Sequence, residues 1–311
     1  MQFPDGRRFA FSILDDTDDA TLENVAPVYR LLEELGFRTT KTAWPMDCPE
    51  GSRLYFAADT LQRPDYCAFV ERLAASGFEI ASHGATMESS LRERTLAGLA
   101  FLRERFGDGV RLHANHGQNR ENLYWGQQRF RLPGLRRLLA RLRPGVPSLG
   151  AEEGSPYFWG DVARQQFAYV RNFTFSGLDM RARNPEMPYR LASTPYVALW
   201  FSTTDAPDVH VWNRRVTRRA LERLEARGGV CIVSTHLGKG FVREGRIDPD
   251  FEATLRWLSG RPGWFVPVST LLDHLRSCGP ADRSLSPWAL ARLELSYLLD
   301  QVAIRARAMW Q

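Results

Sequence analysis

The sequence has little lysine, no cysteine motif and no long apolar segment. Only Lys41 and Lys239 are lysines among its 41 basic residues, so arginine carries nearly all of the positive charge. The four cysteines form no Cys-x-x-Cys pair, which excludes a thiolate zinc cluster and gives no sign of a disulfide framework. No apolar run reaches the roughly 18 residues of a transmembrane helix, and none near the start suits a signal peptide. We therefore expect a cytoplasmic protein with no transmembrane segment.

The overall composition indicates a folded chain with a full core. Its 311 residues are 44% hydrophobic, 25% charged and 12% aromatic, which excludes collagen, low-complexity and wholly disordered chains. The net charge is +5, but the arginines are interleaved with glutamates along helix-like stretches. This pattern favours solvated helix faces over a nucleic-acid stripe, and it also suits an anionic substrate.

Short apolar runs and helical patterns alternate along the chain. The apolar runs predict strands at 9–14, 37–44, 78–81, 110–114, 229–234 and 264–268. Residues at helical spacing predict helices at 21–35, 65–75, 91–106, 214–226, 251–258 and 270–276. Residues 117–208 show only weak periodicity. The alternation predicts an α/β fold with a mainly parallel sheet and helices outside it.

The chain closes with an expected linker at 277–286 and a terminal helix at 287–310. This helix carries apolar residues on two adjacent sides, so it must bury surface. It could do so on its own barrel or in a homodimer contact, and the sequence leaves both open.

Four polar clusters each follow directly on a predicted strand. They are DDTDD at 15–19, SHG at 82–84, HANHGQN at 113–119 and STH at 234–236. Because the carboxyl ends of parallel strands meet at one edge, these clusters should converge there. Adjacent carboxylates repel one another, so the first cluster costs stability unless a cation or a shifted pKa relieves it. A helix N-terminus near Thr21 accounts for Asp19 but not for Asp15 and Asp16, which end the strand.

Residues of these types can hydrolyse an amide or an ester. One carboxylate and imidazoles can hold a divalent ion with open positions, and the ion acidifies a bound water. A second carboxylate takes the proton, and a histidine across the site protonates the departing amine or alkoxide.

Four segments share a known pattern: FSILDDTD at 11–18, AFVERLAASGFEIASH at 68–83, CIVSTH at 231–236 and FVPVSTLLDHLR at 265–276. They resemble the NodB-type polysaccharide deacetylases, carbohydrate esterase family 4. The resemblance covers roughly residues 8–277. It implies a NodB-like distorted (β/α) barrel as the catalytic domain at 1–277, with residues 278–311 as a linker and an added C-terminal helix.

The resemblance also implies roles for particular residues. Asp15 would be the general base, Asp16 and His83 metal ligands, and His236 the acid that protonates the leaving group. The family's second histidine, four positions after the first, is replaced here by Met87. Segment 113–119 supplies two histidines in compensation, and we expect His116 to be the third ligand. The ion should be zinc, with cobalt, nickel, manganese or iron as alternatives.

Further side chains are expected around these residues as substrate-binding or supporting groups. Asp18 is the next candidate ligand if His116 is not one. The others are Lys41, His113, Asn115, Asn119, Trp125, Trp159 and Asp161.

The resemblance implies a metal-dependent carbohydrate deacetylase, an amidohydrolase that removes an acyl group, chiefly N-acetyl, from a sugar in surface-polysaccharide biosynthesis. The expected cytoplasmic location favours a nucleotide-linked or lipid-linked sugar as substrate. Two alternatives remain open. Met87 is compatible with a metal-free, carbohydrate-binding pseudoenzyme, and the spacing of Asp16 and Asp18 with an aspartyl phosphatase-type hydrolase.

Overall fold

Seven parallel strands close into a barrel. The structure, a computed structural model, describes residues 2–52, 58–117, 119–142 and 145–309. In chain order, the barrel strands are β1 (Phe9–Asp15), β2 (Thr40–Ala43), β3 (Glu79–Ser82), β4 (Leu112–His113), β5 (Tyr169–Phe175), β6 (Leu199–Asp205) and β7 (Val230–Thr235). Each strand pairs with the next, and β7 pairs back onto β1, which closes the barrel. A further strand, β10 (Gly263–Trp264), pairs with the first residues of β1.

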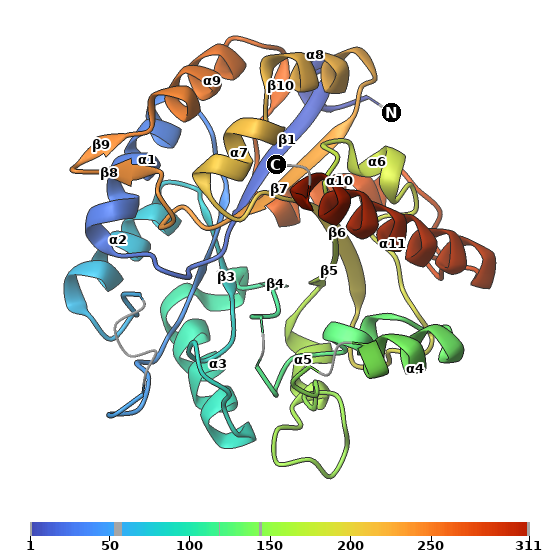
Figure 1. Ribbon diagram of the computed structural model, residues 1–311. Coiled ribbons are helices and arrows are strands. Elements are labelled where there is room, and N and C mark those ends of the chain that lie inside the picture. Colours follow the sequence, from blue (N-terminus) through green and yellow to red (C-terminus); the bar gives the residue numbers. More distant parts are fainter. Residues whose placement is uncertain (1, 53–57, 118, 143–144, 310–311) are drawn as a thin grey trace.

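Helices surround this barrel (Figure 1). They are α1 (Leu22–Glu34), α2 (Pro64–Ala75), α3 (Arg92–Phe106), α4 (Pro133–Leu142), α5 (Gly160–Gln166), α6 (Met180–Arg183), α7 (Val209–Arg215), α8 (Arg218–Ala226), α9 (Pro249–Ser259), α10 (Val268–Ser277) and α11 (Pro287–Met309). Short 3₁₀ turns are η1 (Pro4–Gly6), η2 (Gly107–Gly109) and η3 (Gly126–Arg129), and β8 (Val242–Arg243) pairs with β9 (Arg246–Ile247) outside the barrel. The expected (β/α)-barrel fold with a C-terminal helix is confirmed.

The first βα unit shows how the sequence sets the geometry of the site. Every residue of β1 is buried, and the strand ends at its first acidic residue, Asp15. Thr21 then caps α1. Its hydroxyl accepts from the backbone N–H of Asn24, and the side-chain oxygen of Asn24 accepts from the backbone N–H of Thr21. Residues 16–20 are thereby fixed between a buried strand and a capped helix.

The middle of the chain differs from expectation, because it contributes two long strands to the barrel. β5 and β6 lie at 169–175 and 199–205, inside the segment judged irregular. Both are buried along almost their whole length, yet Arg171, Asn172 and Thr203 interrupt their apolar sequence. Neither an alternating pattern nor an apolar run therefore marked them.

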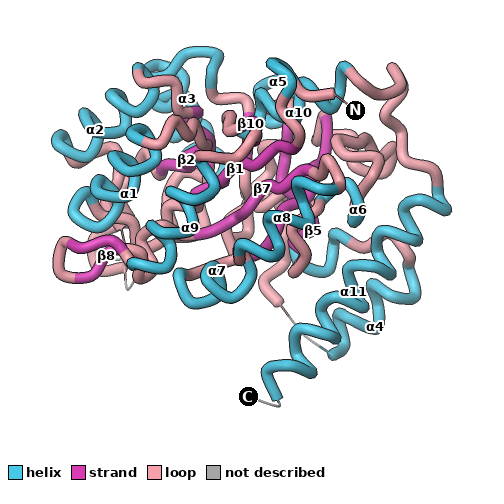
Figure 2. Tube along the Cα trace, turned by 90° about the horizontal axis from the view of Figure 1, so that it is seen from above, coloured by secondary structure: helices cyan, strands magenta, loops and turns pink. Residues whose placement is uncertain are grey.

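The terminal helix α11 packs on its own barrel, beside β5. Tyr297 stacks near Phe173, with ring centroids 4.7 Å apart, and Asp300 accepts hydrogen bonds from the backbone N–H and hydroxyl of Ser176. Figure 2 shows α11 running alongside α4. Trp310, the last residue of the predicted helix, lies outside the described residues. No helix within the described ranges is long and apolar enough to cross a membrane.

Candidate metal centre

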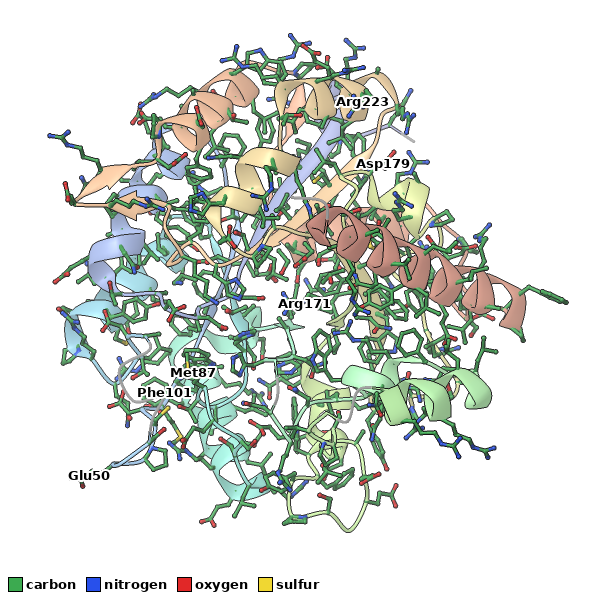
Figure 3. All side chains as sticks on the ribbon, viewed as in Figure 1. Glu50, Met87, Phe101, Arg171, Asp179 and Arg223 are labelled. Carbon is green, nitrogen blue, oxygen red and sulfur yellow. The ribbon has the colours of Figure 1, made fainter. Side chains whose placement is uncertain are left out.

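The polar clusters converge at the carboxyl ends of the strands. Asp18 follows β1, His83 follows β3, His116 lies three residues beyond β4, and His236 follows β7. Arg171 reaches the same region from β5 and lies in the middle of the barrel in Figure 3.

Asp18 lies at the centre of a group of three histidines. The Nε2 atom of His83 is 3.2 Å from its Oδ1, and the Nε2 atoms of His116 and His236 are 3.4 and 3.5 Å from its Oδ2. The Lys239 ammonium is 3.7 Å from Oδ2. Although burial opposes it, contact with the three imidazoles holds the pKa of Asp18 well below its usual range. Asp18 is therefore an anion at neutral pH.

The other nitrogen of each imidazole is held by an oxygen. His83 Nδ1 donates to the Ala114 carbonyl at 2.9 Å, and His236 Nδ1 donates to the Pro207 carbonyl at 2.7 Å. His116 Nδ1 lies 3.2 Å from the Asn119 amide oxygen, whose own amide group donates to backbone carbonyls in the loop after β3. These bonds fix the ring orientations and direct all three Nε2 atoms toward Asp18.

This donor set fits a divalent metal ion. The ligand atoms of Asp18, His83 and His116 all lie within 4.8 Å of one another. Two imidazole nitrogens and a carboxylate oxygen are ligands that zinc accepts in catalytic sites, where a fourth position stays open. The hydrogen bonds on Nδ1 are the outer support that metal-binding histidines normally have.

Asp16 lies beside this group with one oxygen unoccupied. Its Oδ2 accepts from Arg171 Nη1 at 2.5 Å, while its buried Oδ1 has no hydrogen-bond partner among the described residues and is 3.9 Å from His83 Nδ1. Burial raises the pKa of Asp16, but Arg171 and the histidines outweigh it and lower the pKa overall. Asp16 is thus a buried carboxylate with an open oxygen. Arg171 was not predicted, because β5 itself was not recognised.

Asp15 lies beneath the site and differs from the base we expected. It is fully buried, and its Oδ2 accepts from Lys41 Nζ at 3.0 Å and from the Tyr29 hydroxyl at 2.8 Å. Its Oδ1 accepts from the Leu237 backbone N–H. Both oxygens are therefore engaged. Lys41 is equally buried, and although burial opposes it, Asp15 raises its pKa. The predicted Lys41 thus serves Asp15 rather than the rim of the site.

Comparison with known proteins gives matches in structure but not in sequence. No family model matches the chain, and no curated protein matches it significantly. The solved structure of Puue allantoinase is similar over 89% of this chain and 93% of that one, with a TM-score of 0.55 and 15% identity. A protein described as a polysaccharide deacetylase from Mycobacterium smegmatis has a TM-score of 0.49 and 14% identity. The similarity covers 92% of this chain and 96% of that one. The peptidoglycan deacetylase PdaC from Bacillus subtilis, solved as a variant, has a TM-score of 0.43 and 10% identity. The similarity covers 87% of this chain and 92% of that one.

The fold is a closed (β/α) barrel, and Puue allantoinase shares it. At these identities the similarity establishes the fold, and the chemistry has to be argued from the residues present.

Met87 lies apart from the histidines of the candidate site. Residues 83–91 form a loop rather than a helix, so the fourth position after His83 is not on the next helical turn. Met87 packs instead in a small apolar cluster with Trp44 and Cys48, toward the periphery in Figure 3. Trp44 also stacks on His83, with centroids 5.8 Å apart. His116 takes the place beside Asp18 that this loop leaves open.

Several other predicted site residues support the loops. His113 is buried against Trp159 and Phe167, and burial lowers its pKa to about 3, so it is a neutral core residue. The Asn115 amide exchanges hydrogen bonds with the backbone of Leu123. The Trp159 indole N–H donates to the Glu121 carbonyl.

Asp161 and Trp125 have other surroundings. Asp161 pairs with Arg92 near the surface, at 2.8 Å, and not with the histidine group. Trp125 packs against Arg129, and its ring is 6.0 Å from the Arg171 guanidinium carbon. Of these two residues, Trp125 is the one that borders the site.

Proposed function

We propose that this NodB-like protein is a metal-dependent hydrolase that removes an acyl group, chiefly N-acetyl, from a sugar. The observation that carries the proposal is the convergence of three imidazole Nε2 atoms on Asp18, beside a buried carboxylate with an open oxygen. This arrangement provides separate groups for holding an ion, accepting a proton and donating one.

Asp18, His83 and His116 would hold the ion. Zinc suits this donor set best, and cobalt, nickel, manganese and iron are alternatives. A bound divalent ion would supply Lewis-acid polarisation of the acyl carbonyl and acidify a water at neutral pH.

Asp16 is the proposed base, in place of Asp15. Its Oδ1 is free to accept a proton from water, and Arg171 keeps the carboxyl group charged and fixed through Oδ2. Asp15 cannot serve equally well, because Lys41, Tyr29 and the Leu237 N–H already occupy its oxygens.

His236 is the proposed acid. Its Nδ1 is held by the Pro207 carbonyl, and its Nε2 faces the site. Burial alone would lower its pKa, but Asp18 and Asp16 raise it above the ordinary value. A protonated imidazole at this position can give its proton to the departing amine.

The direct test combines metal analysis with acetate release from N-acetylated amino sugars. We expect about one ion per chain in the wild type, none in His83→Ala, and acetate release that stops on chelation and returns with zinc. His274→Ala, a histidine far along the chain on α10, is the matched control and should behave as wild type. A wild-type chain that binds sugar, but binds no metal and releases no acetate, would favour the pseudoenzyme. Phosphate release instead of acetate would favour the phosphatase alternative.

The substrate setting belongs to the same proposal. A sugar precursor for surface polysaccharide, linked to a nucleotide or a lipid, agrees with the basic composition of the chain. A homodimer formed through α11 and the predicted cytoplasmic location also remain proposals.

A further inference from the structure

A large pocket lies beside the metal centre, between α11 and the segment that includes η3 and the start of α4. Its volume is about 1090 Å³, enough for a ligand larger than a single sugar. α11 bounds the pocket with Tyr297, Leu298 and Val302, and α4 bounds it with Arg136 and Arg137.

The charged residues that line this pocket are all arginines. They are Arg129, Arg131, Arg136, Arg137 and Arg305. No carboxylate is among its lining residues in the described ranges. Glu294 lies behind the pocket wall, where it accepts a hydrogen bond from the Arg131 backbone N–H, but burial lowers the pKa of Arg131 by more than Glu294 raises it. Five guanidinium groups around one cavity repel one another, so an anion would stabilise them.

Arg129 is the most informative of them. It is 9% exposed, its Nη1 donates to the Tyr297 hydroxyl at 3.1 Å, and its buried Nε has no hydrogen-bond partner within the described residues. The Nε of Arg131 is likewise buried without a partner in that part of the chain. A buried cation with an unused donor is costly, and a bound ligand that accepts from it would remove that cost.

Trp125 connects the pocket to the metal centre. The guanidinium carbon of Arg129 is 3.5 Å from the Trp125 ring centroid, and that of Arg171 is 6.0 Å from it. Arg171 in turn donates to Asp16. A ligand in the pocket therefore lies one tryptophan side chain away from the residue that holds the proposed base.

We propose that this pocket binds a phosphate or diphosphate group that links the reacting sugar to an apolar or aromatic carrier. The inference rests on the proposed function, since it identifies the part of the substrate that does not react. Guanidinium groups bind phosphate oxygens through paired N–H donors, and the phosphate would satisfy the free Nε atoms. Phe130, Val146 and Pro147 add an apolar wall for the carrier. A neutral polysaccharide would leave the arginines uncompensated.

The test measures binding, so it does not depend on hydrolysis. Calorimetric titrations of chelator-treated protein use inorganic pyrophosphate, uridine diphosphate and farnesyl diphosphate as probes. We expect all three to bind, and Arg129→Gln and Arg131→Gln each to weaken binding about tenfold or more, as for the loss of a charge-assisted hydrogen bond. Arg219→Gln, on the exposed face of α8, is the matched control and should leave affinity unchanged.

The remaining arms separate the outcomes. Tighter binding of farnesyl diphosphate than of uridine diphosphate identifies a lipid carrier, and the reverse identifies a nucleotide. His83→Ala should retain pyrophosphate binding, because the metal centre is not the binding site. Arg129→Lys keeps the charge but loses the planar donor pair, so it should fold and still bind more weakly. The proposal would be overturned if none of the three probes binds, or if both glutamine variants bind with wild-type affinity at unchanged melting temperature. Either outcome would count against the pocket even if acetate release proves the hydrolase correct.

Discussion

Three acidic residues within four positions have three different environments. Asp15 is buried with a lysine, Asp16 with an arginine, and Asp18 faces three histidines. A carboxylate paired with a buried cation is held in place, whereas one surrounded by imidazole nitrogens can share a metal cation with those imidazoles that give up their proton. The same side-chain chemistry therefore supports three separate roles.

The roles of Asp16 and Asp18 can be separated by substitution. Asp18→Asn removes the central charge of the donor set, so we expect bound metal to fall at least about tenfold, as for lost coordination support. Asp16→Asn should retain metal while turnover falls by about 10²-fold or more, since a general base is lost. Metal content by elemental analysis and kcat for acetate release check both. Metal loss in Asp16→Asn with retention in Asp18→Asn would reverse the assignment.

The Lys41–Asp15 pair should matter for stability. Lys41→Met leaves a buried carboxylate with only the Tyr29 hydroxyl and the Leu237 N–H, so we expect the free energy of unfolding to fall by about 3–5 kcal/mol. Urea unfolding measures this change. Lys239→Met, which removes a partly exposed lysine, is the control and should cost less than about 1 kcal/mol. Equal effects of the two substitutions would contradict the structural role of the pair.

Glu121 should make stability depend on pH. It is buried, its Oε2 has no hydrogen-bond partner in the described part of the chain, and burial raises its pKa to about 7. Because the folded pKa exceeds the unfolded one, this residue favours the folded state below about pH 4.5, and that contribution is lost as pH rises to about 7.

The matching experiment compares the wild type with Glu121→Gln. The wild type should lose about 3 kcal/mol relative to the variant between pH 4.5 and 7, which follows from the pKa difference. Denaturant unfolding at several pH values measures it. Parallel stability curves for the two proteins would show that Glu121 is ionised normally.

At the scale of elements, β5 connects the proposed functions of the molecule. It supplies Arg171 to the metal centre on one side, and its Phe173 packs against Tyr297 of α11 on the other. The terminal helix is thus attached to the strand that holds the proposed base in place.

Attachment of α11 should depend on Asp300. Its carboxylate accepts from the Ser176 backbone N–H at 2.7 Å and from the hydroxyl at 2.6 Å. Asp300→Ala leaves the Ser176 N–H and hydroxyl without this acceptor, so we expect the free energy of docking of α11 to weaken by about 1–3 kcal/mol. Hydrogen exchange should rise in α11 and not in α1. Unchanged protection of α11 would mean that its apolar contacts alone hold it.

At the scale of the whole molecule, the outer face of α11 is open. Leu295, Leu299 and Val302 are each more than half exposed, and Trp288 is 86% exposed. Burial of these side chains against a second copy would remove apolar surface from water. We expect the full chain to sediment as a dimer and Leu299→Glu as a monomer, with Arg292→Glu on the same helix as the charge control. A monomeric wild type at high concentration would remove the dimer.

The amino-acid sequence by itself determined the alternation of strands and helices, the mainly parallel sheet and the edge where the polar clusters meet, while the barrel followed from the resemblance of its motifs. Those features depend on local burial patterns and on strand direction. β1, α1 and β7 were predictable because their apolar spacing and caps are local. His83, His116 and His236 could be placed together because each follows a strand.

Only the tertiary structure determined which partners surround each acidic residue after β1. Asp15 is engaged by Lys41 from β2, and Asp16 by Arg171 from β5, more than 150 positions away in sequence. Local spacing carries no information about such partners, because they are set by barrel closure and strand order. The pocket beside α11 has the same origin: four of its arginines lie within residues 129–137, and packing of the terminal helix on β5 brings Arg305 to the same cavity.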